Sequence, residues 1–318
     1  MLNFEAGLYS GLSTPQGSLH FPDVLDWDAA RQFIYDTPEN EIFLGVDGDG
    51  DPIRVNLDDD SPHILINAGS GGGKSTLARG IATQVLTAGA NAVFLDAKRH
   101  SHRWAKNLPG VHYAQAFAEI GDALVSVGME LHRRNEVIDA FPGPIEEAPV
   151  GPRIVLIFEE MNATMDALKS MSKKLPEGEY DAMDALADIM FMGRAAKIHV
   201  VAIAQFASAE AMGGSAIREN FGYRILARYT KQAWTMLAYD CGVPQPAPKQ
   251  KGRGRICHAG VARETQFLYL TEEQAAWLVR AAHEYRQRTG QVRAYTQQEL
   301  QYQARHAQAA LARARGQQ

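Results

Sequence analysis

A short stretch near residue 70 carries the residue types that bind polyphosphates. Glycines at 69 and 71–73 surround Ser70, and Lys74-Ser75-Thr76 follow directly. Glycines let backbone N–H groups turn toward phosphate oxygens, a lysine reaches the β- and γ-phosphates, and a hydroxyl binds Mg²⁺. We therefore predict Lys74 as a catalytic residue and Ser75 as a Mg²⁺ ligand. The predicted ATP-binding residues are Gly69, Ser70, Gly71, Gly72, Gly73, Lys74, Ser75 and Thr76.

The surrounding sequence decides whether this is a phosphate-binding loop or a merely flexible glycine loop. An apolar run at 64–66 predicts a buried strand before it, and apolar residues within 77–86 at helical spacing predict a helix after it. The G-x-x-x-x-G-K-[ST] pattern departs at one position, where Ala68 replaces glycine. The remaining glycines leave the backbone enough freedom, so strand, loop and helix together favour the phosphate-binding loop.

Two adjacent carboxylates follow another apolar run. Residues 154–158 predict a buried strand that ends in Glu159-Glu160. Ligands of open α/β sheets bind at the carboxyl ends of the strands. We predict that Glu159 orients Mg²⁺ and its waters, although aspartate is usual there, and that Glu160 polarises the water that attacks the γ-phosphate. The alternative is a solvated strand end with two surface glutamates.

A third apolar run, at 198–204, ends at Gln205. A polar residue there can contact the γ-phosphate or the attacking water, whereas the alternative is a turn-capping amide. Arg194 and Arg224 flank this run in the sequence. Either arginine could supply, from a neighbouring subunit of a ring, the positive charge that the γ-phosphate needs in the transition state. For each arginine the alternative is a structural salt bridge.

The elements that must position these residues alternate between strands and helices. Near-continuous apolar strands separated by helices predict a parallel sheet covered on both faces. We predict an α/β P-loop NTPase fold of the ASCE/RecA-like class, with a central, mostly parallel sheet and small appendages at both ends. Residues 41–270 are the predicted ATPase motor domain, residues 1–40 an N-terminal appendage, and residues 271–318 a basic helical C-terminal tail.

Local patterns add further expectations. Two β pairs are predicted, at 42–46 with 53–57 and at 255–259 with 265–270. A polar loop is expected from Glu160 to about residue 180. The predicted helices outside the central motifs are 115–127, 129–140, 272–288 and 297–315.

Bulk properties limit the class of protein. The 318-residue chain has a net charge of −5, and no run approaches the ~18 apolar residues of a membrane span. The N-terminus lacks a signal-peptide pattern, and Cys241 and Cys257 lack metal-ligand spacing, so we expect a cytoplasmic protein with free thiols. The charge argues weakly against indiscriminate coating of nucleic acid. It leaves room for local basic surfaces at 169–174, 249–255 and 286–318.

Several linked segments resemble those of the FtsK/SpoIIIE–HerA group of DNA-pumping motors, over roughly residues 41–270. Leu95-Asp96-Ala97-Lys98 resembles that family's DPK strand end, residues 193–205 its RAAGIHLVLATQ run, and residues 219–225 its ANFPTRI. Residues 158–164 and 191–194 look most like the FtsK-like transfer ATPases of actinobacterial conjugative plasmids, integrative elements and some phages.

The resemblance implies an ATP-hydrolysing double-stranded DNA translocase, with ATP and Mg²⁺ as cofactors. It also implies a homo-hexameric ring, a task in transfer of a mobile element, and membrane association only through a separate partner protein. One alternative is a motor for protein secretion or viral genome packaging. Another is an ATP-binding assembly switch that hydrolyses slowly. DNA-stimulated ATPase activity distinguishes the first reading from the others.

Overall fold

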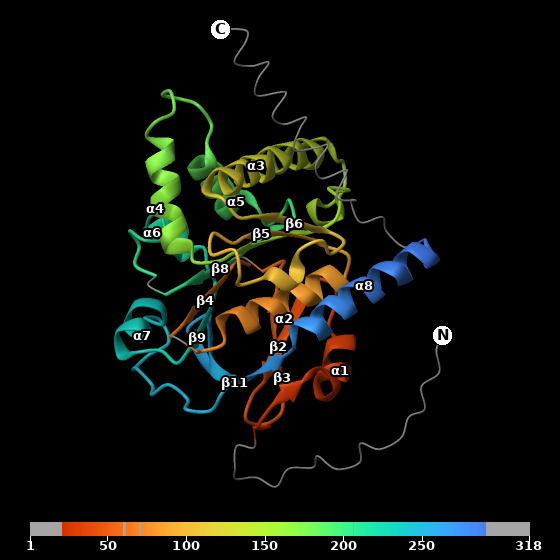
Figure 1. Ribbon diagram of the computed structural model, residues 1–318, viewed down its shortest axis with the longest axis vertical. Helices are drawn as coiled ribbons and strands as arrows, with labels where there is room; N and C mark the ends of the chain where they lie inside the picture. The colour runs from red at the N-terminus through yellow and green to blue at the C-terminus, as the bar shows by residue number, and fades with distance from the viewer. Residues whose placement is uncertain (1–20, 60–61, 70, 206, 291–318) are drawn as a thin grey trace.

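The computed structural model describes residues 21–59, 62–69, 71–205 and 207–290. Within these residues, one eleven-stranded sheet has helices on both faces (Figure 1). The strands are β1 (Leu25–Asp26), β2 (Glu41–Val46), β3 (Pro52–Asn56), β4 (Ile64–Ala68), β5 (Asn91–Leu95), β6 (Val111–Ala114), β7 (Ile154–Phe158), β8 (Ile198–Ala204), β9 (Tyr223–Ala227), β10 (Arg253–His258) and β11 (Val261–Tyr269). The helices are α1 (Trp27–Tyr35), α2 (Lys74–Thr87), α3 (Phe117–Ala140), α4 (Met161–Ser172), α5 (Ala182–Met192), α6 (Ser215–Glu219), α7 (Lys231–Leu237) and α8 (Glu272–Thr289), with 3-10 turns η1 (Arg103–Ala105) and η2 (Ile145–Glu147).

The centre of the sheet is parallel, as predicted. Neighbouring strands follow the order β9-β4-β8-β7-β5-β6, and every pair in this series is parallel. Strands β4, β5 and β8 are buried along their whole length, which explains their continuous apolar sequences. Because these strands run in one direction, their carboxyl ends share one edge of the sheet, called here the carboxyl edge. The opposite edge is called the amino edge.

An antiparallel extension completes the sheet on one side, in the order β3-β2-β11-β10 next to β9. Both predicted β pairs are confirmed as the hairpins β2–β3 and β10–β11. The short β1 pairs with β11, and Asp26 caps α1 by accepting from the N–H of Ala29. Leu25 and Ala30 pack with Phe43, so the described part of the predicted N-terminal appendage is joined to the sheet.

Helices cover the two faces of the sheet in separate layers (Figure 1). On one face, α2 and α8 pack over Ile64, Ile66 and neighbouring strand residues. On the other face, α3, α4 and α5 pack over Leu65 and Phe158. The predicted helix at 272–288 is confirmed as α8, and the one predicted at 297–315 lies outside the described residues. Among the described helices, none combines the length and apolarity that a membrane crossing requires.

The prediction of two helices over 115–140 is wrong, because α3 is one continuous helix. Gly128, near its middle, packs against α5 and Tyr180. A Cβ on Gly128 would overlap the Tyr180 hydroxyl and lie 2.9 Å from the Cβ of Ala185. The glycine therefore permits close helix packing instead of breaking the helix.

The predicted polar loop up to residue 180 is also wrong, because α4 occupies its first part. Met161, Thr164, Met165 and Leu168 form its buried face, at a helical spacing that polar neighbours conceal in the sequence. Strand β6 was not predicted, since only Val111 and Ala114 at its two ends are buried.

Candidate active site

The glycine loop joins β4 to α2 at the carboxyl edge. Gly71 and Gly73 adopt φ values of 68° and 87°, in the left-handed region that favours glycine. Helix α2 begins at Lys74, and no side chain caps its N-terminus within the described residues. The first N–H groups of a helix need acceptors, so this end suits an anion. Ser75 and Thr76 lie in this first turn, whereas Ser70 lies outside the described residues.

Ala68 fits into the loop because Gly72, which packs against it, has no side chain. A Cβ on Gly72 would lie 2.9 Å from both the Cβ of Ala68 and the carbonyl oxygen of Gly69. The loop closes through a hydrogen bond from the N–H of Gly72 to that same oxygen, 2.9 Å long. The departure from the usual motif is therefore compatible with the turn, because Gly72 leaves room for the methyl group of Ala68.

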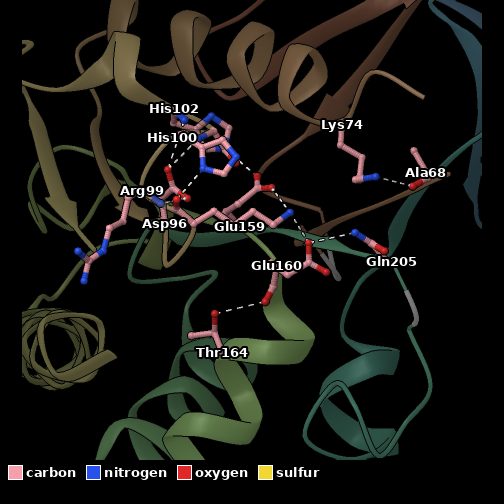
Figure 2. A network of polar contacts seen from close by, with 12 residues as sticks. Ala68, Lys74, Asp96, Arg99, His100, His102, Glu159, Glu160, Thr164 and Gln205 are labelled. Atoms are coloured by element: carbon pink, nitrogen blue, oxygen red, sulfur yellow. Dashed lines mark hydrogen bonds and ion pairs between the residues drawn. The ribbon is translucent and has the colours of Figure 1, made fainter. Parts of the chain in front are cut away.

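Lys74 reaches back across the loop from the start of α2. Its Nζ donates to the carbonyl oxygen of Ala68 at 2.7 Å (Figure 2). It also donates to the carbonyl oxygen of Gly69 at 3.4 Å. Burial lowers the pKa of Lys74, and the nearby ammonium of Lys98 lowers it further, while Glu160 and Glu159 act in the opposite direction. The ammonium is thus electrostatically coupled to both predicted carboxylates.

Glu159 is buried at the end of β7, with 1% of its surface exposed. Its Oε2 lies 2.9 Å from Nε2 of His102, and its Oε1 accepts from Nζ of Lys98 at 3.3 Å (Figure 2). Burial alone would raise the pKa of Glu159, but His102 and Lys98 outweigh it and hold that pKa below its ordinary value. With both oxygens engaged, Glu159 suits the orientation of metal-bound water better than direct coordination of Mg²⁺.

Glu160 is the residue before α4 and has a left-handed backbone, with φ of 49°. Its side chain points toward Gln205, whose Nε2 donates to Oε2 at 3.3 Å (Figure 2). The same carboxylate forms an ion pair with Lys98. A non-glycine residue in this region costs about 1 kcal/mol or more, and such strain gathers at functional sites.

Gln205 is held at the end of β8 by a residue that the sequence motifs did not single out. Nδ2 of Asn67, on the neighbouring β4, donates to the carbonyl oxygens of Ala204 and Gln205 at 3.0 and 2.9 Å. This link ties the end of β8 to the start of the glycine loop. The structure therefore brings Lys74, Glu160 and Gln205 to one edge, as expected.

The loop after β5 supplies Lys98 and His102, neither of which was predicted as a site residue. It folds around the buried carboxylate of Asp96, which accepts from the N–H groups of Arg99 and Ser101, each at 3.1 Å. Contacts with Glu160 and Glu159 raise the pKa of Lys98 even though burial opposes them. The one sequence signal for this loop was the resemblance of residues 95–98 to the DPK strand end.

Arg194 and Arg224 do not join this group within one chain. Arg194 is exposed in the turn between α5 and β8, at the amino edge. Arg224 is buried near the start of β9, where its Nη2 donates to Asp240 at 2.6 Å and its guanidinium lies over Tyr239. The seven residues of β8 separate the two edges by about 23 Å. A role for either arginine from a neighbouring subunit stays a prediction.

The described residues fit ATP and Mg²⁺ by their chemistry. The uncapped N-terminus of α2 and Lys74 suit phosphates, and the hydroxyl of Ser75 with Glu159 suits a hydrated Mg²⁺. No group of three or more histidine, cysteine or acidic residues able to hold a metal occurs among the described residues. The chain would thus supply part of a coordination shell that phosphate oxygens and water complete, as is usual for Mg²⁺.

Comparisons with known proteins give distant sequence relatives. The chain matches no protein-family model. It is 26% identical over 260 residues to the DNA translocase FtsK of Staphylococcus aureus strain Mu50, covering 75% of this chain and 31% of the relative. The FtsK of Staphylococcus epidermidis is 24% identical over 250 residues, covering 71% and 29%. The chain therefore spans about a third of the length of these relatives.

Solved structures with the same fold were also found. The conjugation coupling protein TcpA of pCW3, in a monomer form with ATPγS, superposes with a TM-score of 0.68 at 20% identity, covering 84% of this chain and 75% of that one. The cytoplasmic domain of the type VII secretion ATPase EccC of Thermomonospora curvata gives 0.60 at 17% identity, covering 77% and 32%. The chain has a P-loop ATPase fold. At these identities the similarity concerns the fold alone.

Proposed function

We propose that this chain hydrolyses ATP, with Glu160 polarising the attacking water. The observation that carries the proposal is the convergence of Lys74, Glu160 and Gln205, from three different segments, at the carboxyl edge. Lys74 would exchange its loop carbonyls for β- and γ-phosphate oxygens, and Gln205 would orient the water that Glu160 activates. Bound Mg²⁺, held by Ser75 and oriented by Glu159, would neutralise charge on the phosphates.

Lys98 has a positioning task in this proposal. Adjacent carboxylates repel each other, and Lys98 contacts both of them. Because Asp96 holds the loop that carries Lys98, the ammonium keeps a defined place between Glu159 and Glu160. Lys98 therefore offsets the repulsion between the buried carboxylate of Glu159 and the carboxylate of Glu160 beside it.

We further propose that hydrolysis drives movement along double-stranded DNA, in a homo-hexameric ring that transfers a mobile element. The similarity to a DNA translocase over 75% of this chain supports DNA as the track. The fold similarity to a conjugation coupling protein supports transfer as the task. Membrane association would then come through a separate partner protein.

Helix α4 is the element that we propose to couple hydrolysis to DNA. It begins directly after Glu160 and ends beside Lys173 and Lys174, which are exposed. Twelve helical residues span about 18 Å, so a shift at Glu160 would move these two lysines as part of a rigid rod. In Figure 1, α4 stands at the margin of the molecule with its C-terminal loop projecting outward.

Several arginines of the other two predicted basic surfaces make contacts within the fold. Arg253 bonds Gln266, and Arg255 pairs with Glu264 at 2.7 Å. Arg286 donates to the carbonyl oxygens of Leu86 and Thr87 and so caps the C-terminus of α2. These engaged side chains favour the lysines after α4 as the contact with phosphates.

ATP hydrolysis with and without duplex DNA tests the proposal. We expect duplex DNA to raise the rate several-fold, with a steep loss at high salt because the contacts are to phosphates. A Lys173→Ala/Lys174→Ala variant should lose DNA stimulation and keep basal hydrolysis. Lys249→Ala/Lys251→Ala is the matched control, since it also removes two exposed lysines. An equal loss in the control would reject the assignment to α4.

The fold similarity to the secretion ATPase EccC favours a second candidate, a motor for protein secretion. Unfolded casein as the added polymer separates the two candidates. Stimulation by casein and not by duplex DNA would support secretion and reject DNA translocation. ATP binding without turnover under either condition would instead support an assembly switch.

A further inference from the structure

Arg228 follows the last residue of β9 and lies beside the glycine loop. Strands β9 and β4 are parallel, and Ala227 is opposite Ala68 in their register, so the residues that follow, Arg228 and Gly69, are neighbours. The N–H of Gly69 donates to the carbonyl oxygen of Ala227 at 3.1 Å. The end of β9 is therefore part of the wall that shapes the loop.

The contacts of the loop glycines place the Arg228 side chain. A Cβ on Gly69 would lie 2.7 Å from the carbonyl oxygen of Arg228, and a Cβ on Gly71 would lie 3.0 Å from its Nη1. The guanidinium thus lies against the middle of the glycine loop. Among the described residues, no hydrogen-bond or ion-pair partner is found for this exposed side chain.

A cavity of about 200 Å³ extends the loop toward the catalytic group. Its lining includes Asn67, Gly69, Gln205 and Arg228, and Arg228 is the single charged residue among the described lining residues. Gln205 bonds Glu160, so this cavity borders the place where the proposed reaction needs the γ-phosphate. A positive charge without acidic neighbours in the lining favours an anionic ligand.

The backbone of Arg228 adds an independent sign of function. Its φ of 48° lies in the left-handed region, which costs a non-glycine residue about 1 kcal/mol or more. Glycine or asparagine would adopt this conformation more easily, yet the position carries a long cationic side chain. The strained turn and a guanidinium without a partner in the described part of the chain occur together at the loop.

We propose that Arg228 binds the terminal phosphate of ATP from within the same chain. This proposal rests on the proposed ATPase function. Lys74 and Arg228 would then approach the γ-phosphate from two different elements, Lys74 from α2 and Arg228 from the end of β9. Each chain would carry two cations at this phosphate before any neighbouring subunit adds one.

Nucleotide binding by the full-length chain tests the assignment. The dissociation constants of ATPγS and ADP are measured with Mg²⁺ for the wild type, Arg228→Ala and Arg228→Lys. A charge-assisted contact predicts a loss of ~10-fold or more for ATPγS in Arg228→Ala, and less than about 3-fold for ADP. Arg228→Lys should lie between, because lysine keeps the charge without the planar fork. Arg263→Ala, which removes an exposed arginine on β11, is the control and should change neither constant.

The outcomes separate this proposal from the ATPase proposal. Retained ADP binding shows that Arg228→Ala is folded, so a selective loss of ATPγS supports the contact. Equal losses for ATPγS and ADP, or no loss for either, overturn it while leaving the ATPase proposal intact. A wild type that binds neither nucleotide overturns both. A wild type that hydrolyses ATP without DNA stimulation rejects only DNA translocation, and a selective ATPγS loss would still support Arg228.

Discussion

The two adjacent glutamates should respond differently to replacement by glutamine. Glu160→Gln keeps an oxygen that can accept from Gln205, and Lys98 keeps its contact with Glu159. We therefore expect the free energy of unfolding to change by less than ~0.5 kcal/mol, as for a partly exposed ion pair. Turnover should fall by ~10²-fold or more, because an amide cannot accept the proton of the attacking water.

Glu159→Gln acts on a buried carboxylate that contacts Lys98 and His102. Lys98 and His102 contact different oxygens of Glu159, and glutamine offers only one oxygen, so one of the two contacts meets the NH2 group instead. The contact that remains also loses the charge that makes it stronger. We expect the free energy of unfolding to fall by about 1–2 kcal/mol. Hydrolysis should need more Mg²⁺, while the rate at saturating Mg²⁺ should fall less than in Glu160→Gln.

Three measurements distinguish the roles of the two glutamates: chemical denaturation, ATPγS binding, and turnover across a Mg²⁺ titration. A 10²-fold loss of rate in Glu160→Gln corresponds to about 2.7 kcal/mol of activation free energy. ATP binding should be retained, so the variant should accumulate with ATP bound. Mild and equal losses of turnover in both variants would refute the assignment of this strand end to catalysis.

Three further changes test other parts of the molecule. Lys74→Ala should weaken ATP binding by ~100-fold or more, and wild-type hydrolysis by this variant would show that the loop assignment is wrong. Gly69→Ala should weaken ATP binding, because the added Cβ would lie 2.7 Å from the carbonyl oxygen of Arg228. Its control is Gly80→Ala in α2, where the added Cβ meets only ordinary contacts. Thermal melts should show that Gly80→Ala stabilises the fold by ~0.5–1 kcal/mol. Burial lowers the pKa of His63 to about 4, so the folded state stays neutral while the unfolded state takes up a proton below pH 6.5. The free energy of unfolding should therefore fall by about 3 kcal/mol as the pH is lowered from 6.5 to 4. In chemical denaturation at the two pH values, His63→Gln should show a decrease that is smaller by this amount.

The parts of the site that could be predicted are those with local signals. Glycines, a lysine and a flanking strand–helix pattern identify the loop around Lys74 without tertiary information. Glu160 and Gln205 could be placed beside it because parallel strands bring their carboxyl ends to one edge. Glu160 and Gln205 each follow a continuous apolar run that predicts a buried strand. The sequence therefore predicts that both lie at the carboxyl end of a strand.

The parts that could not be predicted depend on which strands become neighbours. Arg228 lies against Gly71 because β9 pairs with β4, and no local sequence pattern predicts that pairing. Lys98 reaches both glutamates because its loop folds around Asp96, a tertiary arrangement. Proximity in sequence also misleads, since Arg194 precedes β8 closely yet lies at the edge opposite to Gln205.

The placement of Arg194 at the amino edge has a consequence for assembly. If it acts on a neighbour's γ-phosphate, the amino edge of one subunit must meet the carboxyl edge of the next. Such a contact joins two different surfaces, so it is head-to-tail and can close into a ring, whereas a two-fold dimer cannot make it. Arg224 is less suited to this task, because Asp240 and the fold hold it.

Mixing two inactive variants tests this arrangement. Arg194→Ala keeps the ATP site and lacks the arginine, and Glu160→Gln keeps the arginine and lacks the base. In random mixed rings about a quarter of the interfaces would pair an intact ATP site with an intact arginine, so turnover should rise well above that of either variant alone. Hydrolysis by the wild type should also increase with protein concentration, because the interface must form. Arg194→Ala with wild-type turnover would reject the role of this arginine. Activity that is independent of concentration in a monomeric sample, with no gain on mixing, would reject head-to-tail catalysis and leave Lys74 and Arg228 of one chain as the cations at the phosphates.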